Sequence, residues 1–149
     1  MDSLISAMSN GTLMAEMGDM MKDQIKKSVM NQTPLEKDLT EATSNENWPV
    51  GNTVKYNIAN ATEHYQDLHM ILSTIWECLE QPGRRWRSVF KALTLLEFLI
   101  KNGSIRVAEE AGDNSFKLKA LHNFQFESDG KDKGQGVREL SKNVITLVQ

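Results

Sequence analysis

The sequence predicts an all-α fold of about seven short helices, with an eighth, amphipathic helix at the N-terminus. Apolar residues recur with helical spacing through most of the chain, whereas no segment shows the sustained alternation of a β-strand. The segment 84–103 is the clearest case, because apolar residues surround the helix axis from Leu95 to Ile100, as in a helix buried among others. With 149 residues, 40% of them hydrophobic, the chain has the size of one compact domain.

The composition argues against several classes of protein. A membrane span needs about 20 consecutive apolar residues, and the sequence contains no such run. The acidic start of the chain does not resemble a secretory signal. A single cysteine excludes an internal disulfide and is typical of a reducing, intracellular compartment. The net charge of −3 argues against a nucleic-acid partner. No spacing of histidine or cysteine predicts a metal site or a catalytic triad, so we expect no enzyme and no cofactor.

The N-terminal region divides into two segments. Residues 1–15 show no sustained period and are expected to form a flexible leader, whereas residues 16–31 carry one apolar helical stripe. Such a stripe is too weakly supported to persist as a lone helix in water, but a membrane interface can accept it. Packing against the domain itself or against a second copy is the alternative. The stripe contains Met17, Met21, Ile25 and Val29, and it is flanked by Lys22 and Lys26.

The helical core is expected over residues 33–149. It begins where Thr33, Pro34 and Glu36 can form a capping box with proline at the first helical position. Glycine and proline separate the helices that follow, and Ser104 is expected to cap one of them. Residues 124–126 are too short to make a sheet, and residues 128–136 are expected to form a loop. The expected helices are 33–43, 52–61, 64–80, 84–103, 104–112, 115–123 (with Phe116, Leu118 and Leu121 facing the core) and 137–148.

Basic residues gather at the start of the helix expected over residues 84–103. The polar arc there consists of Arg84, Arg87, Ser88 and Lys91, and Arg85 adds a fourth cation to the segment. The opposite side, expected to face the core, consists of Trp86, Val89, Phe90 and Leu93. Cations at this end oppose the helix macrodipole, so stability does not explain four of them. An ordinary solvated face is the alternative, but an acidic chain with a local basic patch favours a site for a compact anion.

Several ordered motifs resemble the epsin N-terminal homology (ENTH) domain family. They are EATSN at residues 41–45 followed by Trp48, WRSVFKAL at 86–93, EFLIKNGS at 97–104, and DGKDKG at 129–134. The resemblance covers roughly residues 20–149. It implies a right-handed superhelix that binds phosphoinositide headgroups on the cytosolic face of membranes. It also implies an N-terminal segment that lipid orders into an amphipathic helix, which enters the leaflet and promotes curvature.

The resemblance also implies site residues. Together with Arg87 from the basic arc, the expected phosphoinositide-binding residues are Lys22, Lys26, Asn45, Arg84, Arg87 and Lys91, and the expected membrane-inserting residues are Met17, Met21, Ile25 and Val29. Thr40, Cys78 and Ser88 stand where basic residues are usual in bisphosphate-binding members. Since each charged phosphate contact is worth about 1.5–3 kcal/mol, three missing donors make a 4-phosphate as acceptable as a 4,5-bisphosphate.

The expected function is that of a membrane adaptor domain that supports clathrin-coated vesicle formation, in endocytosis or in Golgi and endosome traffic. The alternative is a cargo-binding module for a SNARE or for ubiquitin with weak lipid binding, which the three missing cations favour. Clathrin and adaptor coats are expected to bind regions beyond Gln149, because this sequence holds none of their short motifs. The expected location is cytoplasmic and peripheral to the plasma membrane, the Golgi, endosomes or coated vesicles.

Overall fold

The computed structural model of this chain describes residues 32–149, and over them the expected all-α fold is confirmed. The expected leader 1–15 and amphipathic segment 16–31 lie outside the described residues, so both stay predictions. The α-helices are α3 (Pro34–Ala42), α4 (Asn52–Ala61), α5 (Tyr65–Leu79), α6 (Trp86–Asn102), α7 (Ile105–Asp113), α8 (Ser115–Lys119) and α9 (Gln135–Val148). Two 3₁₀ helices and two short strands complete them: η1 (Gly83–Arg85), η2 (Ala120–Asn123), β1 (Glu127–Ser128) and β2 (Lys131–Asp132).

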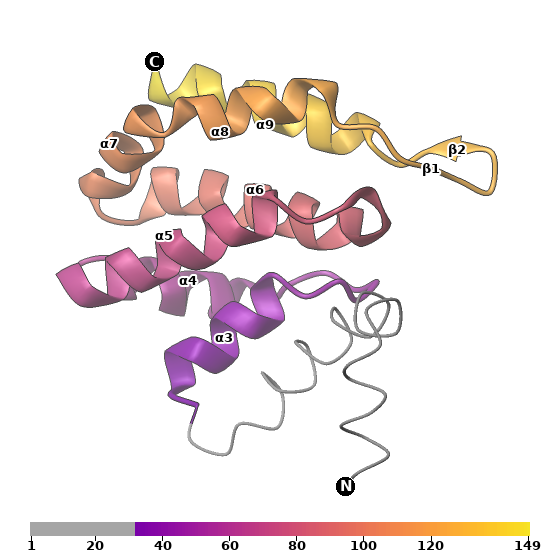
Figure 1. Ribbon diagram of the computed structural model, residues 1–149. Helices are drawn as coiled ribbons and strands as arrows, with labels where there is room; N and C mark the ends of the chain where they lie inside the picture. The colour runs from indigo at the N-terminus through magenta and orange to yellow at the C-terminus, as the bar shows by residue number, and fades with distance from the viewer. Residues whose placement is uncertain (1–31) are drawn as a thin grey trace, which may run out of the picture. The chain divides into compact units, whose positions relative to one another are not determined.

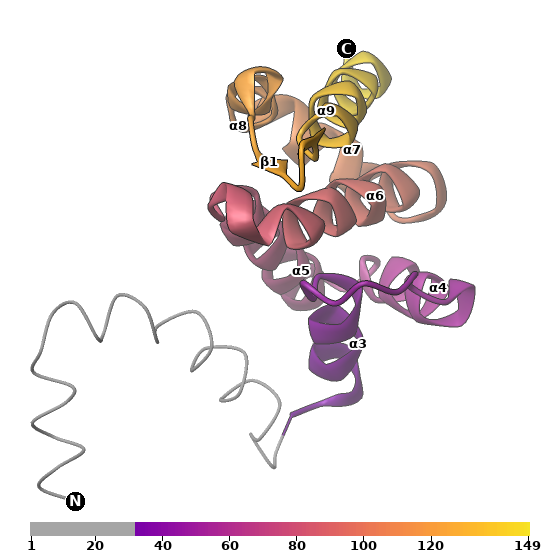
Figure 2. The same ribbon diagram turned by 90° about the vertical axis from the view of Figure 1, so that its right-hand side faces the viewer.

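The helices of residues 34–149 are stacked in successive layers (Figures 1 and 2). Helices α3 and α4 lie at one end, α5 and α6 in the middle, and α7, α8 and α9 at the other end. Helix α6 packs against α4, α5, α7 and α9, so it is the central helix that its apolar sequence predicts. Its side chains Leu93, Leu95, Leu96 and Leu99 are at most 1% exposed. Within residues 32–149, no helix combines the length and apolar content that crossing a bilayer requires.

A close joint connects α4, α6 and α7. The Ser104 hydroxyl accepts a hydrogen bond from the Arg106 backbone N at 3.2 Å, which confirms the expected cap of α7. The backbone N of Ser104 donates to the Thr62 hydroxyl at 2.8 Å, just past the end of α4. A Cβ at Gly103 would lie 2.7 Å from that hydroxyl and 2.8 Å from the Leu99 carbonyl oxygen. The joint therefore requires glycine at this position.

Three predictions about the C-terminal third are wrong. Phe116 is 64% exposed, whereas Leu118 and Leu121 are buried as expected. Positions 116 and 118 are two residues apart on a helix, so they point in nearly opposite directions. The predicted loop 128–136 contains a β-hairpin, in which β1 and β2 pair in antiparallel register and the last helix begins earlier than expected. Asp129 and Gly130 both have positive φ, 55° and 74°, the geometry of a type I′ turn.

Candidate anion-binding site

The polar arc of α6 packs against the loop that follows α3. The Ser88 hydroxyl donates to the Thr43 carbonyl oxygen at 2.6 Å, and the Ser88 backbone N donates to Asn45 Oδ1 at 3.4 Å. Lys91 Nζ donates to the Ser44 hydroxyl at 3.1 Å. The N-cap residue of α6, Arg85, makes no side-chain capping bond. Asn45 therefore supplies from a distant segment the acceptor that an unpaired N–H of the first helical turn needs.

Because of this packing, the prediction of which side chains of α6 face the core is wrong at two positions. Ser88, placed on the solvent arc by its sequence, is only 2% exposed, because the loop covers it. Phe90, placed on the core side, is 37% exposed. A buried serine is stable there because both its hydroxyl and its backbone N–H have partners. The first half of α6 thus presents an aromatic ring to solvent beside its cations.

Two cations at this end of α6 lie over indole rings. The Arg87 guanidinium is 4.8 Å from the centre of the Trp86 ring, and Lys91 Nζ is 5.9 Å from that of Trp48. Among the described residues, the buried Nε of Arg87 has no hydrogen-bond partner. Desolvation lowers the pKa of Lys91, and Arg87 lowers it further, against the opposing effect of two acids, Glu46 and Glu41. An anion placed here would favour the charged lysine and offer Arg87 an acceptor.

The structure brings Asn45, Arg87 and Lys91 together around this loop. Arg84 lies on a different element, η1, with its side chain exposed. The other expected residues, Lys22 and Lys26 and the membrane-inserting Met17, Met21, Ile25 and Val29, lie outside the described residues.

The three positions that lack a cation are engaged within the fold. The Thr40 hydroxyl donates to the Glu36 carbonyl oxygen at 2.9 Å, Cys78 is buried, and Ser88 has the partners described above. None of them offers a charged donor to a ligand.

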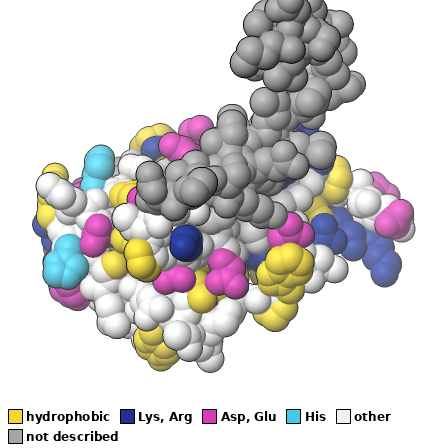
Figure 3. Space-filling model, turned by 90° about the horizontal axis from the view of Figure 1, so that it is seen from below, with side chains coloured by type: hydrophobic (Ala, Val, Ile, Leu, Met, Phe, Trp, Pro, Cys, Tyr) yellow, Lys and Arg dark blue, Asp and Glu magenta, His cyan; other side chains and the backbone are white. Residues whose placement is uncertain are grey.

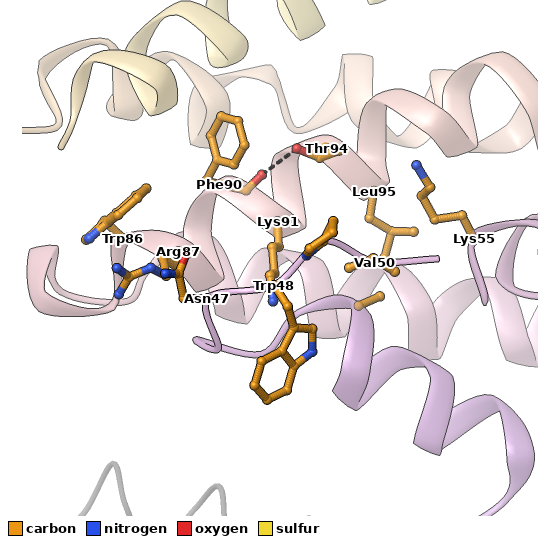
Figure 4. A pocket seen from close by; sticks show the side chains of 12 residues that line it. Asn47, Trp48, Val50, Lys55, Trp86, Arg87, Phe90, Lys91, Thr94 and Leu95 are labelled. Atoms are coloured by element: carbon orange, nitrogen blue, oxygen red, sulfur yellow. Dashed lines mark hydrogen bonds between the residues drawn. The ribbon is translucent and has the colours of Figure 1, made fainter. Parts of the chain in front are cut away.

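A groove of about 300 Å³ lies between α6 and loop residues 47–50 (Figure 4). In Figure 4, α6 forms one wall, and Trp48 extends from the loop below Lys91. Of the residues that line the groove, sequence reasoning assigned only Arg87 and Lys91 to a site, and it missed Trp48, Lys55 and Phe90 among others. The available signal was a set of aromatic residues in the segments that carry the cations. The lining side chains are Ala42, Asn47, Trp48, Pro49, Val50, Lys55, Trp86, Arg87, Phe90, Lys91, Thr94 and Leu95.

The distribution of charge over the surface is uneven. Seen from below, several basic side chains lie towards the right-hand edge, where Figure 1 places the β1–β2 hairpin, beside acidic side chains, and few basic side chains are visible over the rest of this face (Figure 3). Within residues 32–149, no cluster of three or more histidine, cysteine or acidic side chains could hold a metal ion. The side chains around the start of α6 are mainly basic and aromatic, and such a surface suits an anionic ligand.

Comparison with known proteins gives a consistent result. The family model "ENTH domain" matches residues 32–149. Epsin-2 of Mus musculus is 41% identical over 127 residues, which are 85% of this chain and 21% of that protein. The structure of the human epsinR ENTH domain is 32% identical with a TM-score of 0.75, covering 80% of this chain and 89% of that one.

A second solved structure adds a ligand. The ENTH domain from epsin-2 in complex with phosphatidylinositol 4,5-bisphosphate is 25% identical with a TM-score of 0.77, covering 83% of this chain and 87% of that one. The chain spans about a fifth of the length of the curated relatives that it matches.

Proposed function

Since this chain belongs to the ENTH domain family, we propose that it is a phosphoinositide-binding membrane adaptor domain of an epsin-like protein. The observation that supports the proposal is that Asn45 and Lys91 join the loop after α3 to the first turns of α6, beside Arg87, with exposed Arg84 on the preceding element. Convergent amide and cationic donors suit a phosphorylated ring. The epsin-2 relative solved with phosphatidylinositol 4,5-bisphosphate supports the same ligand class.

In the proposed mechanism, the headgroup binds first to the preformed part of the site. A phosphate oxygen replaces Ser44 as the partner of Lys91 and also contacts Arg84 and Arg87. Lys22 and Lys26 then close over the headgroup, so that residues 16–31 form a helix at the membrane surface. Binding of the headgroup and ordering of this segment are therefore coupled.

The apolar stripe of that helix then enters the leaflet. If Met17, Met21, Ile25 and Val29 each buried half of their side chain, each would contribute about 1 kcal/mol. The ordering of roughly 15 residues opposes this gain, so insertion alone is weak and requires the headgroup as a second signal. The domain acts as a reversible, non-enzymatic adaptor at the cytosolic surface. It supports clathrin-coated vesicle formation at the plasma membrane or at Golgi and endosomal membranes, through coat partners that bind outside this chain.

Vesicle sedimentation tests the proposal. Phosphatidylcholine vesicles are compared with vesicles that also contain phosphatidylinositol 4-phosphate or the 4,5-bisphosphate. We expect binding only with a phosphoinositide, at least a tenfold loss for Arg84→Glu, and no change for the matched control Lys119→Glu on α8. Circular dichroism should show a gain of helix when vesicles bind. Equal sedimentation with plain phosphatidylcholine would contradict the proposal.

The alternative function is a cargo-binding ENTH module for a SNARE or for ubiquitin, with weak lipid contact. The observation that favours it is the engagement of Thr40, Cys78 and Ser88 within the fold, which leaves the headgroup site with fewer cations. Indifference to phosphoinositides in the sedimentation assay, combined with capture of purified ubiquitin or a SNARE helical bundle, would support this alternative.

A further inference from the structure

We propose that the groove between α6 and loop residues 47–50 is a docking site for an acidic peptide that carries one aromatic or large aliphatic side chain. This inference goes beyond headgroup capture, because the groove has apolar walls and a cation, Lys55, that the headgroup site does not use. The two sites share Arg87 and Lys91.

The walls of the groove can hold one large apolar side chain. Trp48 is 54% exposed and Phe90 is 37% exposed, although both are large aromatic residues. Val50, Trp86 and Leu95 line the same space. A volume of about 300 Å³ lies at the lower limit of ligand pockets, so it suits one side chain of a peptide better than a whole cofactor. Apolar anchors in such pockets usually carry most of the binding energy of a peptide.

The positive charge of the groove indicates which residues should lie on either side of the apolar anchor in the peptide. Lys55, Arg87 and Lys91 line it, and none of its described lining residues is acidic. Glu41 and Glu46 act on Lys91 electrostatically, but neither lines the groove. The cations are fixed over aromatic rings, since Lys55 Nζ lies 5.1 Å from the centre of the Phe98 ring and Lys91 lies over Trp48. Carboxylates on either side of an apolar anchor complement this arrangement.

A second groove provides the contrast. It has a volume of about 230 Å³, and Tyr65, Trp76, Arg106 and Glu110 are among its lining residues. The Arg106 guanidinium lies 4.9 Å from the centre of the Tyr65 ring, and Tyr65 is 65% exposed. This groove also pairs an exposed aromatic ring with a cation, but it includes a carboxylate. Tyr65 is therefore a matched control for Phe90.

Fluorescence anisotropy with a labelled peptide tests the inference. The probe is Glu-Asp-Glu-Phe-Glu-Asp-Glu, compared with one peptide in which glutamine and asparagine replace the acids and another in which glycine replaces phenylalanine. We expect the acid-free peptide to bind at least tenfold more weakly than the probe, and the glycine peptide at least fivefold more weakly. Phe90→Ala and Lys55→Gln should each weaken binding of the probe at least fivefold, whereas Tyr65→Ala should leave it unchanged.

The same variants separate this inference from headgroup capture. Phe90→Ala and Lys55→Gln should sediment normally with phosphoinositide vesicles, whereas Arg84→Glu should lose the vesicles and keep the peptide. The docking site is refuted by any of three results: no measurable binding of the probe, equal binding of the acid-free peptide, or an equal loss for Tyr65→Ala. Loss of vesicle binding in Phe90→Ala would also overturn it, because the groove would then be a membrane contact.

Discussion

The two halves of α6 are both helical, but the first lies beside the candidate ligand site and the second lies in the core. The first half, residues 86–94, makes polar contacts with the loop after α3 and leaves Phe90 exposed. The second half, residues 95–102, places Leu95, Leu96 and Leu99 in the core at no more than 1% exposure. The comparison shows how one helix can present a ligand site rigidly, because its second half is fixed in the core. Substitutions in the two halves should therefore separate stability from binding.

The largest expected effect is in the core half. Leu96→Ala leaves a cavity in the centre of the stack, and we expect it to lower the free energy of unfolding by about 2–5 kcal/mol. Urea denaturation followed by circular dichroism measures this loss. At temperatures where the variant remains folded, its vesicle binding should equal that of the parent. A marked loss of binding in the folded variant would break the separation between the halves.

Ser88→Ala should affect both stability and ligand binding. The change removes the buried hydroxyl that donates to the Thr43 carbonyl oxygen, and leaving that acceptor unpaired should cost about 1–3 kcal/mol of stability. Because the same contact holds the loop that carries Asn45, we also expect weaker vesicle binding. Urea denaturation and vesicle sedimentation check the two effects on one preparation. An unchanged affinity would mean that the loop keeps its position without this hydrogen bond.

Ser104→Ala probes a polar contact at the far end of α6. The Ser104 hydroxyl caps α7, and losing such a cap usually costs about 1 kcal/mol. We expect this loss in urea denaturation with no change in peptide or vesicle binding, because the residue lies beyond the core half. Ser104→Thr keeps the capping oxygen and should recover most of the stability.

The smallest expected effect is the pH dependence of Lys91. Desolvation holds its pKa below the usual 10.5, so the unfolded chain binds more protons between the two values. Stability from this residue therefore rises with pH through that window and is lost as the pH falls through it. Lys91→Met removes the titrating amine, so the parent should gain stability relative to the variant as the pH approaches 10.5. Paired urea titrations measure the difference, and an opposite slope would contradict the burial of this lysine.

Most helices could be predicted because proline and glycine residues mark where they begin and end. Pro49 and Gly51 precede α4, Pro82 and Gly83 follow α5, and Gly103 ends α6. Each signal acts within a few residues, so no knowledge of the tertiary structure was needed.

Sidedness could not be predicted where a distant segment covers a helix. Ser88 is buried by a contact with Thr43, 45 residues earlier, and no periodicity within α6 reports that contact. The groove was missed for the same reason: its cations Arg87 and Lys91 were evident, but its shape and the position of Lys55 depend on how residues 47–50 and α4 lie against α6. The contributions expected from residues 16–31 stay predictions.

The hairpin shows a different limit. Asp129-Gly130 is a turn signal, but the flanking residues lack strand alternation, so a loop was expected. A contact from α9 holds the hairpin: the Arg138 guanidinium donates to the Phe124 carbonyl oxygen at 2.8 Å and pairs with Asp132. Hydrogen bonding to Arg138 lowers the pKa of Asp132 below its usual value, which favours the charged carboxylate of this pair. The residue that fixes the hairpin thus lies outside it in the sequence.

The joint at Thr62 has a mechanical consequence. The Thr62 hydroxyl donates to the Ala59 carbonyl oxygen at 2.5 Å and accepts from the backbone N of Ser104, so the end of one layer is tied to the start of another. With Gly103 wedged beside it, neither layer can slide past the other without breaking these bonds. A displacement at the end of α4 is therefore passed directly to the start of α7.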